Sequence, residues 1–158
     1  MADTLPAPKE IRDLLTDLIG KDVSVQLADP PGKVDKPAVA VFVHDDMSIA
    51  GVIGMEFPLA ADLAAAVGLI PPGGAQAALE DGELSPMLTD NLAEICNVLT
   101  GLLNRDGGPH VKLSSIHAPG EEVPGDVLGY LQALGNRLDL DVAVTGYSHG
   151  LFSLVGGR

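Results

Sequence analysis

The residues best suited to chemistry lie in one column of a segment that is predicted to be helical, residues 85–104. Spacings of four, three and four residues place Asp90, Glu94, Asn97 and Gly101 on the same face of a helix. The column sets a carboxylate and a carboxamide one turn apart, with a glycine one turn further on. A solvated helix face more usually carries Lys, Glu, Gln or Arg, because Asn and Gly are poorer helix formers. This face is therefore the best candidate site in the chain.

Glu94 and Asn97 together offer a carboxylate and an amide to one partner. The amide oxygen of Asn97 can accept a hydrogen bond, for example from water, while its NH2 group donates one. Because the amide does not titrate, Asn97 could orient a water molecule but could not act as a general base. The Glu94 carboxylate would pair with a cation of a partner. The open alternative is an ordinary solvated helix face, on which Asp90 is only a favourable charge near the helix start.

The segment that carries the column has helix signals at both ends. Ser85 is a suitable N-cap, Pro86 suits the first helical position, and Asn104 with the following Arg-Asp-Gly-Gly suits the end. On the other side of the helix, apolar residues recur at helical spacing and predict a buried face: Leu88, Leu92, Ile95, Leu99 and Leu102.

The rest of the chain predicts an α+β fold. Helices are expected at residues 10–20, 59–69, 75–79 and 126–138, and strands at 23–27, 38–44, 49–57, 111–116, 139–145 and 151–155. We expect a mixed, mostly antiparallel sheet with helices packed on one face. Residues 1–8 are expected to be a flexible tail and residues 9–158 a single domain.

The two halves of the chain resemble each other. EIRDLLTDLIG at 10–20 aligns with EICNVLTGLLN at 94–104, which sets Glu10 on Glu94 and Asp13 on Asn97. Each half is then expected to run helix, strand, β-hairpin, as a pseudo-two-fold repeat. A carboxylate at position 13 lacks the amide donor that Asn97 has. The first helix is therefore predicted to be the structural copy.

The motif Asp90-x3-Glu94-x2-Asn97 followed by Gly101 resembles that of the CheC/CheX/FliY family of chemotaxis phosphatases. Pro119, in a strand-ending segment, stands about where the family pattern has a proline. The order of predicted helices and strands is also similar over most of the chain. With only one complete motif, the chain looks more like CheX than like the two-site CheC proteins.

This resemblance implies a phosphatase that hydrolyses the aspartyl phosphate of a CheY-like response regulator. Asn97 would position the in-line water, and Glu94 would dock the receiver by pairing with its active-site lysine. Asp90, Gly101 and Pro119 would contact the partner, and the missing side chain at Gly101 would let the partner's backbone approach. Mg2+ would come with the phosphorylated receiver, so we expect no cofactor and no metal site of the chain's own. The resemblance also implies a homodimer.

The alternative is a non-catalytic protein of the same fold. Such a domain would bind a receiver, or act as an adaptor or scaffold in a two-component or flagellar pathway, without hydrolysing anything. The presence of both Glu94 and Asn97 favours catalysis, because a binding module needs neither residue in particular.

Composition narrows the classes of partner and the compartment. A formal charge of −13 argues against nucleic acid and anionic membranes, which attract basic surfaces. We read no signal peptide and no membrane span, and the single Cys96 cannot form an internal disulfide, so a cytoplasmic protein with a buried, inert thiol is expected. The four histidines lie far apart in the sequence, which does not favour a metal cluster.

Overall fold

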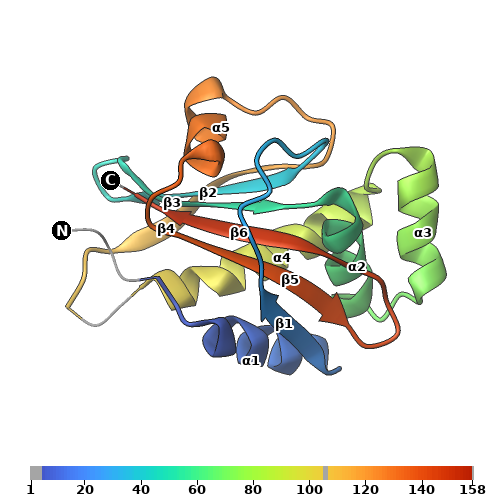
Figure 1. The fold of residues 1–158 in the computed structure, drawn as a ribbon. Helices are drawn as coiled ribbons and strands as arrows, with labels where there is room; N and C mark the ends of the chain where they lie inside the picture. The colour runs from blue at the N-terminus through green and yellow to red at the C-terminus, as the bar shows by residue number, and fades with distance from the viewer. Residues whose placement is uncertain (1–4, 105–106, 158) are drawn as a thin grey trace.

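The computed structural model describes residues 5–104 and 107–157. Within these ranges the chain forms an α+β fold, as predicted (Figure 1). In chain order, its elements are α1 (Pro8–Ile19), β1 (Val23–Leu27), β2 (Ala38–His44), β3 (Ile49–Met55), α2 (Phe57–Val67), α3 (Pro72–Asp81), α4 (Pro86–Leu103), β4 (Val111–His117), α5 (Gly125–Gln132), β5 (Arg137–Val144) and β6 (His149–Gly156).

The six strands form one sheet in the order β1-β5-β6-β3-β2-β4. Every neighbouring pair in this sheet is antiparallel. If β1 is exchanged with β4, β2 with β5 and β3 with β6, the strand order becomes β4-β2-β3-β6-β5-β1. This is the observed order read from the other edge of the sheet. The sheet therefore has a pseudo-two-fold axis between β3 and β6, which confirms the predicted repeat of helix, strand and hairpin.

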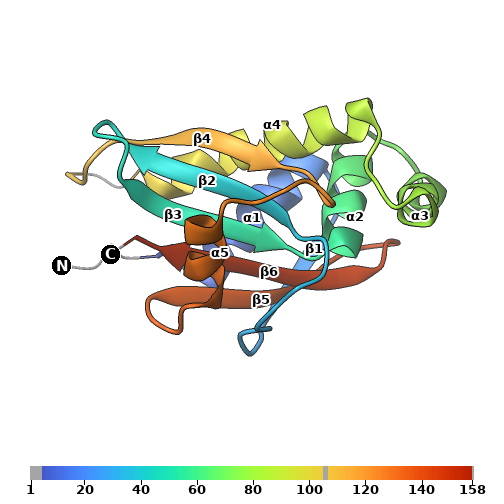
Figure 2. The same cartoon turned by 90° about the horizontal axis from the view of Figure 1, so that it is seen from above.

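Helices cover both faces of the sheet, although the sequence predicted them on one face only. α1, α2 and α4 pack on one face over the main core, and α5 lies on the opposite face (Figures 1 and 2). The physical reason is that β2 and β3 are buried along almost their whole length, so both of their faces need cover. Under α5 lies a second, smaller apolar cluster formed by Val39, Val41, Val43, Val52 and Val127.

The helix predicted at 126–138 is shorter than expected, because α5 ends at Gln132. Ala133 already has an extended backbone and Asn136 a positive φ of 47°, so the chain turns before β5 begins at Arg137. The guanidinium of Arg137 then donates to the backbone oxygen atoms of Leu131 (2.9 Å) and Ala133 (2.5 Å), which ties the end of α5 to the sheet.

The same arginine forms a buried ion pair. Its Nε and one terminal nitrogen each lie 2.8 Å from an oxygen of Asp139, and both side chains are more than nine-tenths buried. Ser153 Oγ of the neighbouring strand donates to the same carboxylate at 2.6 Å. Burial alone would raise the pKa of Asp139, but the hydrogen bonds from Arg137 and Ser153 hold that pKa below its ordinary value.

One predicted strand end lies two residues too late. The strand predicted at 49–57 ends at Met55, because Phe57 and Pro58 form the first turn of α2. The predicted flexible tail falls partly on residues 1–4, outside the described residues, while Leu5 packs against the core and Pro8 begins α1. Among the described residues, we find no helix that is both long and apolar enough to cross a bilayer.

Candidate functional site

The candidate site lies on α4, whose ends are fixed as the sequence predicted. Ser85 Oγ accepts a hydrogen bond from the backbone nitrogen of Leu88 (3.2 Å), and Asn104 is the C-cap residue. At that end, the Asn104 side chain exchanges two hydrogen bonds of 2.8 Å with the backbone of Val111 at the start of β4. α4 is thus held rigidly against the sheet, with its apolar side inward: Leu88, Leu92, Ile95, Cys96 and Leu99 are buried.

Cys96 belongs to this buried side and takes no part in the site. Burial raises the pKa of its thiol to about 12, so the side chain stays protonated and unreactive at neutral pH. The expectation of a buried, inert cysteine is confirmed.

The opposite side of α4 presents the predicted column to solvent. Asp90, Glu94, Asn97 and Gly101 are all exposed. Residues three apart on a helix have Cβ atoms about 5–6 Å from each other, so the Glu94 carboxylate and the Asn97 amide can reach one ligand together. Within the described part of the chain, neither of these two side chains makes a hydrogen bond or an ion pair. Both are therefore available to a partner.

Sequence reasoning missed one member of the column, Met87. It lies three residues before Asp90, on the same face, and its side chain is 59% exposed. The same spacing rule that found the other members would have found it. Met87 thus adds an exposed, flexible apolar side chain to the end of the polar column.

Pro119 does not belong to the exposed column. It is buried, two residues after the end of β4. A buried proline fixes the path of the loop that follows β4, so its influence on a partner would pass through that loop rather than through direct contact.

The counterparts of Glu94 and Asn97 in α1 are held by their own helix. Glu10 Oε1 accepts from the backbone nitrogen of Ala7 (2.9 Å), which caps the start of α1. Asp13 lies 2.6 Å from Lys9 Nζ and 3.2 Å from Arg12 Nε. The hydrogen bond from Lys9, helped by Arg12, lowers the pKa of Asp13 below its ordinary value.

Among the described residues, the column on α4 coincides neither with a metal-binding group nor with the pocket that the structure shows under α5. In the described ranges, no three His, Cys, Asp or Glu side chains are grouped so as to hold a metal ion. A pocket of about 480 Å³ lies on the face of the sheet that α5 covers, and no residue of the α4 column lines it. The exposed column therefore lies outside this pocket.

No protein-family model matches the chain, and no curated protein matches its sequence. Several solved structures do match its fold. The FliM middle domain from H. pylori is 13% identical, with a TM-score of 0.64 over 94% of this chain and 84% of that one. FliY from Thermotoga maritima is 14% identical, with a TM-score of 0.59 over 94% and 82%.

A third match is a chain of the CheX–CheY–BeF3–Mg2+ complex from Borrelia burgdorferi. It is 12% identical, with a TM-score of 0.55 over 94% of this chain and 93% of that one. At such identities the likeness concerns the fold, and it covers nearly the whole chain. The chain has the fold of the CheC/CheX/FliY proteins, as the motif and the order of elements predicted.

Proposed function

We propose that this protein accelerates hydrolysis of the aspartyl phosphate on a CheY-like response regulator. One observation carries the proposal: Glu94 and Asn97 lie one turn apart, exposed, and make no hydrogen bond or ion pair within the described residues, whereas their counterparts Glu10 and Asp13 are both engaged in α1. The likeness to a chain from a CheX–CheY complex supports the class of partner.

The proposed chemistry needs only positioning. An aspartyl phosphate is already activated, and phosphoryl transfer passes through a loose transition state. The amide oxygen of Asn97 would accept from the attacking water and hold it in line with the bond that breaks, while the amide NH2 donates to a phosphoryl oxygen. A neutral amide adds no negative charge next to the phosphorus. This is the property that Asp13 lacks in the first copy.

Glu94 would dock the receiver rather than touch the phosphorus. Its carboxylate would pair with the lysine of the receiver's active site and so fix the depth at which Asn97 enters. Mg2+ would be held by the receiver, so this chain would contribute no metal ligand. Asp90 and Met87 would extend the contact at one end of the column.

Gly101 would complete the docking surface at the other end. A Cβ atom built at this position meets no other atom within 4 Å, so the fold itself does not require a glycine there. A flat helix surface at this point would let the receiver's backbone come close to α4.

We further propose that the protein acts in the cytoplasm and forms a homodimer through an exposed edge of the sheet, at β1 or β4.

The second candidate is a receiver-binding or adaptor domain without catalysis. The likeness to the FliM middle domain favours it, because that likeness is as extensive as those to FliY and CheX. The exposed Met87 fits both candidates, since each needs a docking surface.

The two candidates differ in the fate of the phosphoryl group. Phosphoryl loss should be followed for candidate receivers with the wild type, Asn97→Ala and Glu94→Ala. Gln76→Ala and Glu80→Ala, exposed amide and carboxylate positions on α3, are matched controls. We expect Asn97→Ala to bind but to lose about 100-fold in rate, as a misplaced nucleophile does, and Glu94→Ala to bind more weakly. Binding by the wild type with unchanged phosphoryl loss would establish the adaptor instead.

A further inference from the structure

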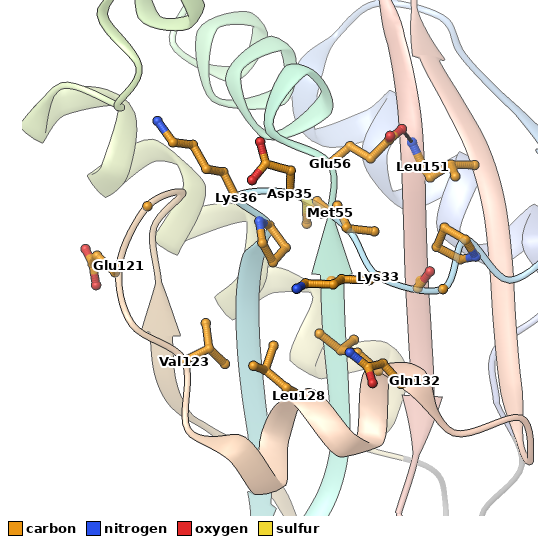
Figure 3. Close-up of a pocket in the computed structure, with 18 residues that line it drawn as sticks. Lys33, Asp35, Lys36, Met55, Glu56, Glu121, Val123, Leu128, Gln132 and Leu151 are labelled. Carbon is orange, nitrogen blue, oxygen red and sulfur yellow. Dashed lines mark hydrogen bonds between the residues drawn. The ribbon is translucent and has the colours of Figure 1, made fainter.

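The pocket under α5 is a second feature of the molecule that the proposed function does not use. Its volume of about 480 Å³ lies in the range of small-molecule sites. Its walls are residues 31–37 of the loop between β1 and β2, three residues of the loop after β4 (Gly120, Glu121 and Val123), and α5 itself (Figure 3). Its floor is formed by β3 and β6, at Met55, Leu151 and Ser153.

Leu131 of α5 packs closely on Gly54 of β3. A Cβ atom at position 54 would lie 2.9 Å from one methyl carbon of Leu131 and 3.2 Å from the other, so a side chain there would push the end of the Leu131 side chain aside. The guanidinium of Arg137, which is paired with Asp139, holds this same end of α5 by donating to the backbone oxygen atoms of Leu131 and Ala133. The pocket is therefore built from well-anchored elements on this side.

The lining is mostly apolar. Its large side chains are Val34, Met55, Val123, Leu128, Leu131 and Leu151. Such a lining, beside a few polar groups, is typical of pockets that bind the apolar body of an organic ligand.

One of the lining residues is a lysine, Lys33, which is also exposed to solvent. Figure 3 shows the side chain of Lys33 lying across the pocket, with its nitrogen on the side of Val123 and Leu128. In the described part of the chain, Lys33 makes no hydrogen bond or ion pair. By contrast, Lys36 Nζ donates to the backbone oxygen of Gly82 at 3.1 Å, and Glu56 Oε1 accepts from the backbone nitrogen of Leu151 at 2.7 Å.

The geometry points to a small monocarboxylate with an apolar body as the ligand of this pocket, its carboxylate paired with Lys33 Nζ. A neutral apolar ligand would cover the ammonium without giving it a partner. A phosphate dianion is disfavoured, because phosphate sites use several donors, and here Asp35, Glu56 and Glu121 add negative charge to the lining. A single negative charge on an apolar chain satisfies both the ammonium and the apolar walls.

The first test uses the wild-type protein and its methionine methyl groups. Decanoate, kept below its micelle concentration, is titrated while the methyl signals are recorded by NMR. We expect a saturable shift at Met55, which lines the pocket, and none at the exposed Met47 and Met87. A Met55 signal that does not move, or equal shifts at Met47 and Met87, would overturn the inference and indicate no binding or non-specific association.

The second test separates the charge from the apolar walls. Lys33→Met should weaken decanoate binding about tenfold, as expected for one charged hydrogen bond, while leaving binding of decanol unchanged. Lys21→Met, at an exposed lysine outside the pocket, should change neither. Equal decanoate affinity in Lys33→Met and the wild type would overturn the assignment of Lys33. Leu128→Trp, checked for folding by circular dichroism, should fill the pocket and abolish binding of both probes; undiminished binding by a folded Leu128→Trp would overturn the site.

Discussion

Asn91 and Asn97 lie on the same helix, six residues apart, and the fold uses them in opposite ways. Asn91 Nδ2 donates to the backbone oxygen of Ala64 at 3.0 Å. Ala64 is in the last turn of α2, where carbonyl groups lack helical partners, so Asn91 closes that turn and joins α2 to α4. Asn97 is exposed and makes no hydrogen bond within the described ranges. The fold thus explains a poor helix former at position 91 but not at position 97.

This contrast predicts opposite effects on stability. Asn91→Ala should lower the free energy of unfolding by about 1 kcal/mol, because the Ala64 oxygen loses its partner. Asn97→Ala should raise it by a few tenths of a kcal/mol, because alanine is the better helix former. Urea unfolding of both variants measures the two values. A loss in Asn97→Ala as large as that in Asn91→Ala would mean that Asn97 is structural.

Two substitutions of Gly101 test its effect on stability and its effect on receiver binding separately. Gly101→Ala should raise the free energy of unfolding by about 0.5 kcal/mol, since the position is exposed and unobstructed in the last turn of α4. Gly101→Gln should fold equally well but weaken receiver binding, because its side chain would stand between α4 and the partner. Calorimetric titration with the receiver, using Thr89→Gln off the column as a control, tests this. Unchanged affinity in Gly101→Gln would remove Gly101 from the docking surface.

The buried ion pair under α5 predicts a large loss of stability. Arg137→Met should cost about 3–5 kcal/mol, because it leaves the Asp139 carboxylate buried without its cation. The double variant Arg137→Met/Asp139→Leu should recover much of this loss, which chemical denaturation can measure. A double variant no more stable than Arg137→Met would show that the backbone contacts of Arg137, rather than the charge of Asp139, dominate.

The ion pair of Arg137 with Asp139 also predicts how the stability of the fold depends on pH. The pKa of Asp139 is lower in the folded protein than in the unfolded chain, where an aspartate has a pKa of about 3.9. Its contribution is therefore fully present above that value and is lost as the pH falls through the lower folded pKa. Unfolding curves between about pH 5 and pH 2 should show this loss in the wild type and not in the double variant.

The pairing of His149 with Asp141 predicts the opposite dependence of stability on pH. Its Nδ1 lies 2.9 Å from Asp141 Oδ1, and this hydrogen bond is the main cause of a raised pKa. The stability from this pair is fully present below the unfolded pKa of about 6.5 and is lost as the pH rises through the folded pKa. NMR titration of the imidazole should show the raised pKa, and Asp141→Asn should bring it back toward the ordinary value. An unchanged titration in Asp141→Asn would contradict the pairing.

Much of the fold could be predicted from local patterns. The strand β1, the apolar runs of β2 and β3 and the Ser85 cap each follow from short-range chemistry, and the structure confirms them, although Leu27 at the end of β1 is exposed. The repeat was visible because both halves need the same amphipathic helix. The face on which α5 packs was not predicted, since the burial of Val39 and Val41 on the second face shows only in the assembled sheet.

The functional features, like the fold, could be predicted from the sequence only in part. The column on α4 follows from helical periodicity alone, so spacing was sufficient to place Asp90, Glu94, Asn97 and Gly101 on one exposed face. The engagement of Asp13 by Lys9 also involves neighbours on one helix. The pocket around Lys33 could not be predicted, because it combines two loops and α5 that are distant in sequence.

The most direct test of the proposed function is the rate of phosphoryl loss from a bound receiver with Asn97→Asp. This change keeps the shape of the side chain but removes the amide donor and introduces the negative charge that α1 carries at Asp13. The proposal predicts that the wild type accelerates phosphoryl loss and that Asn97→Asp, at concentrations that saturate the receiver, does not. Equal acceleration by the two proteins would contradict the role of Asn97.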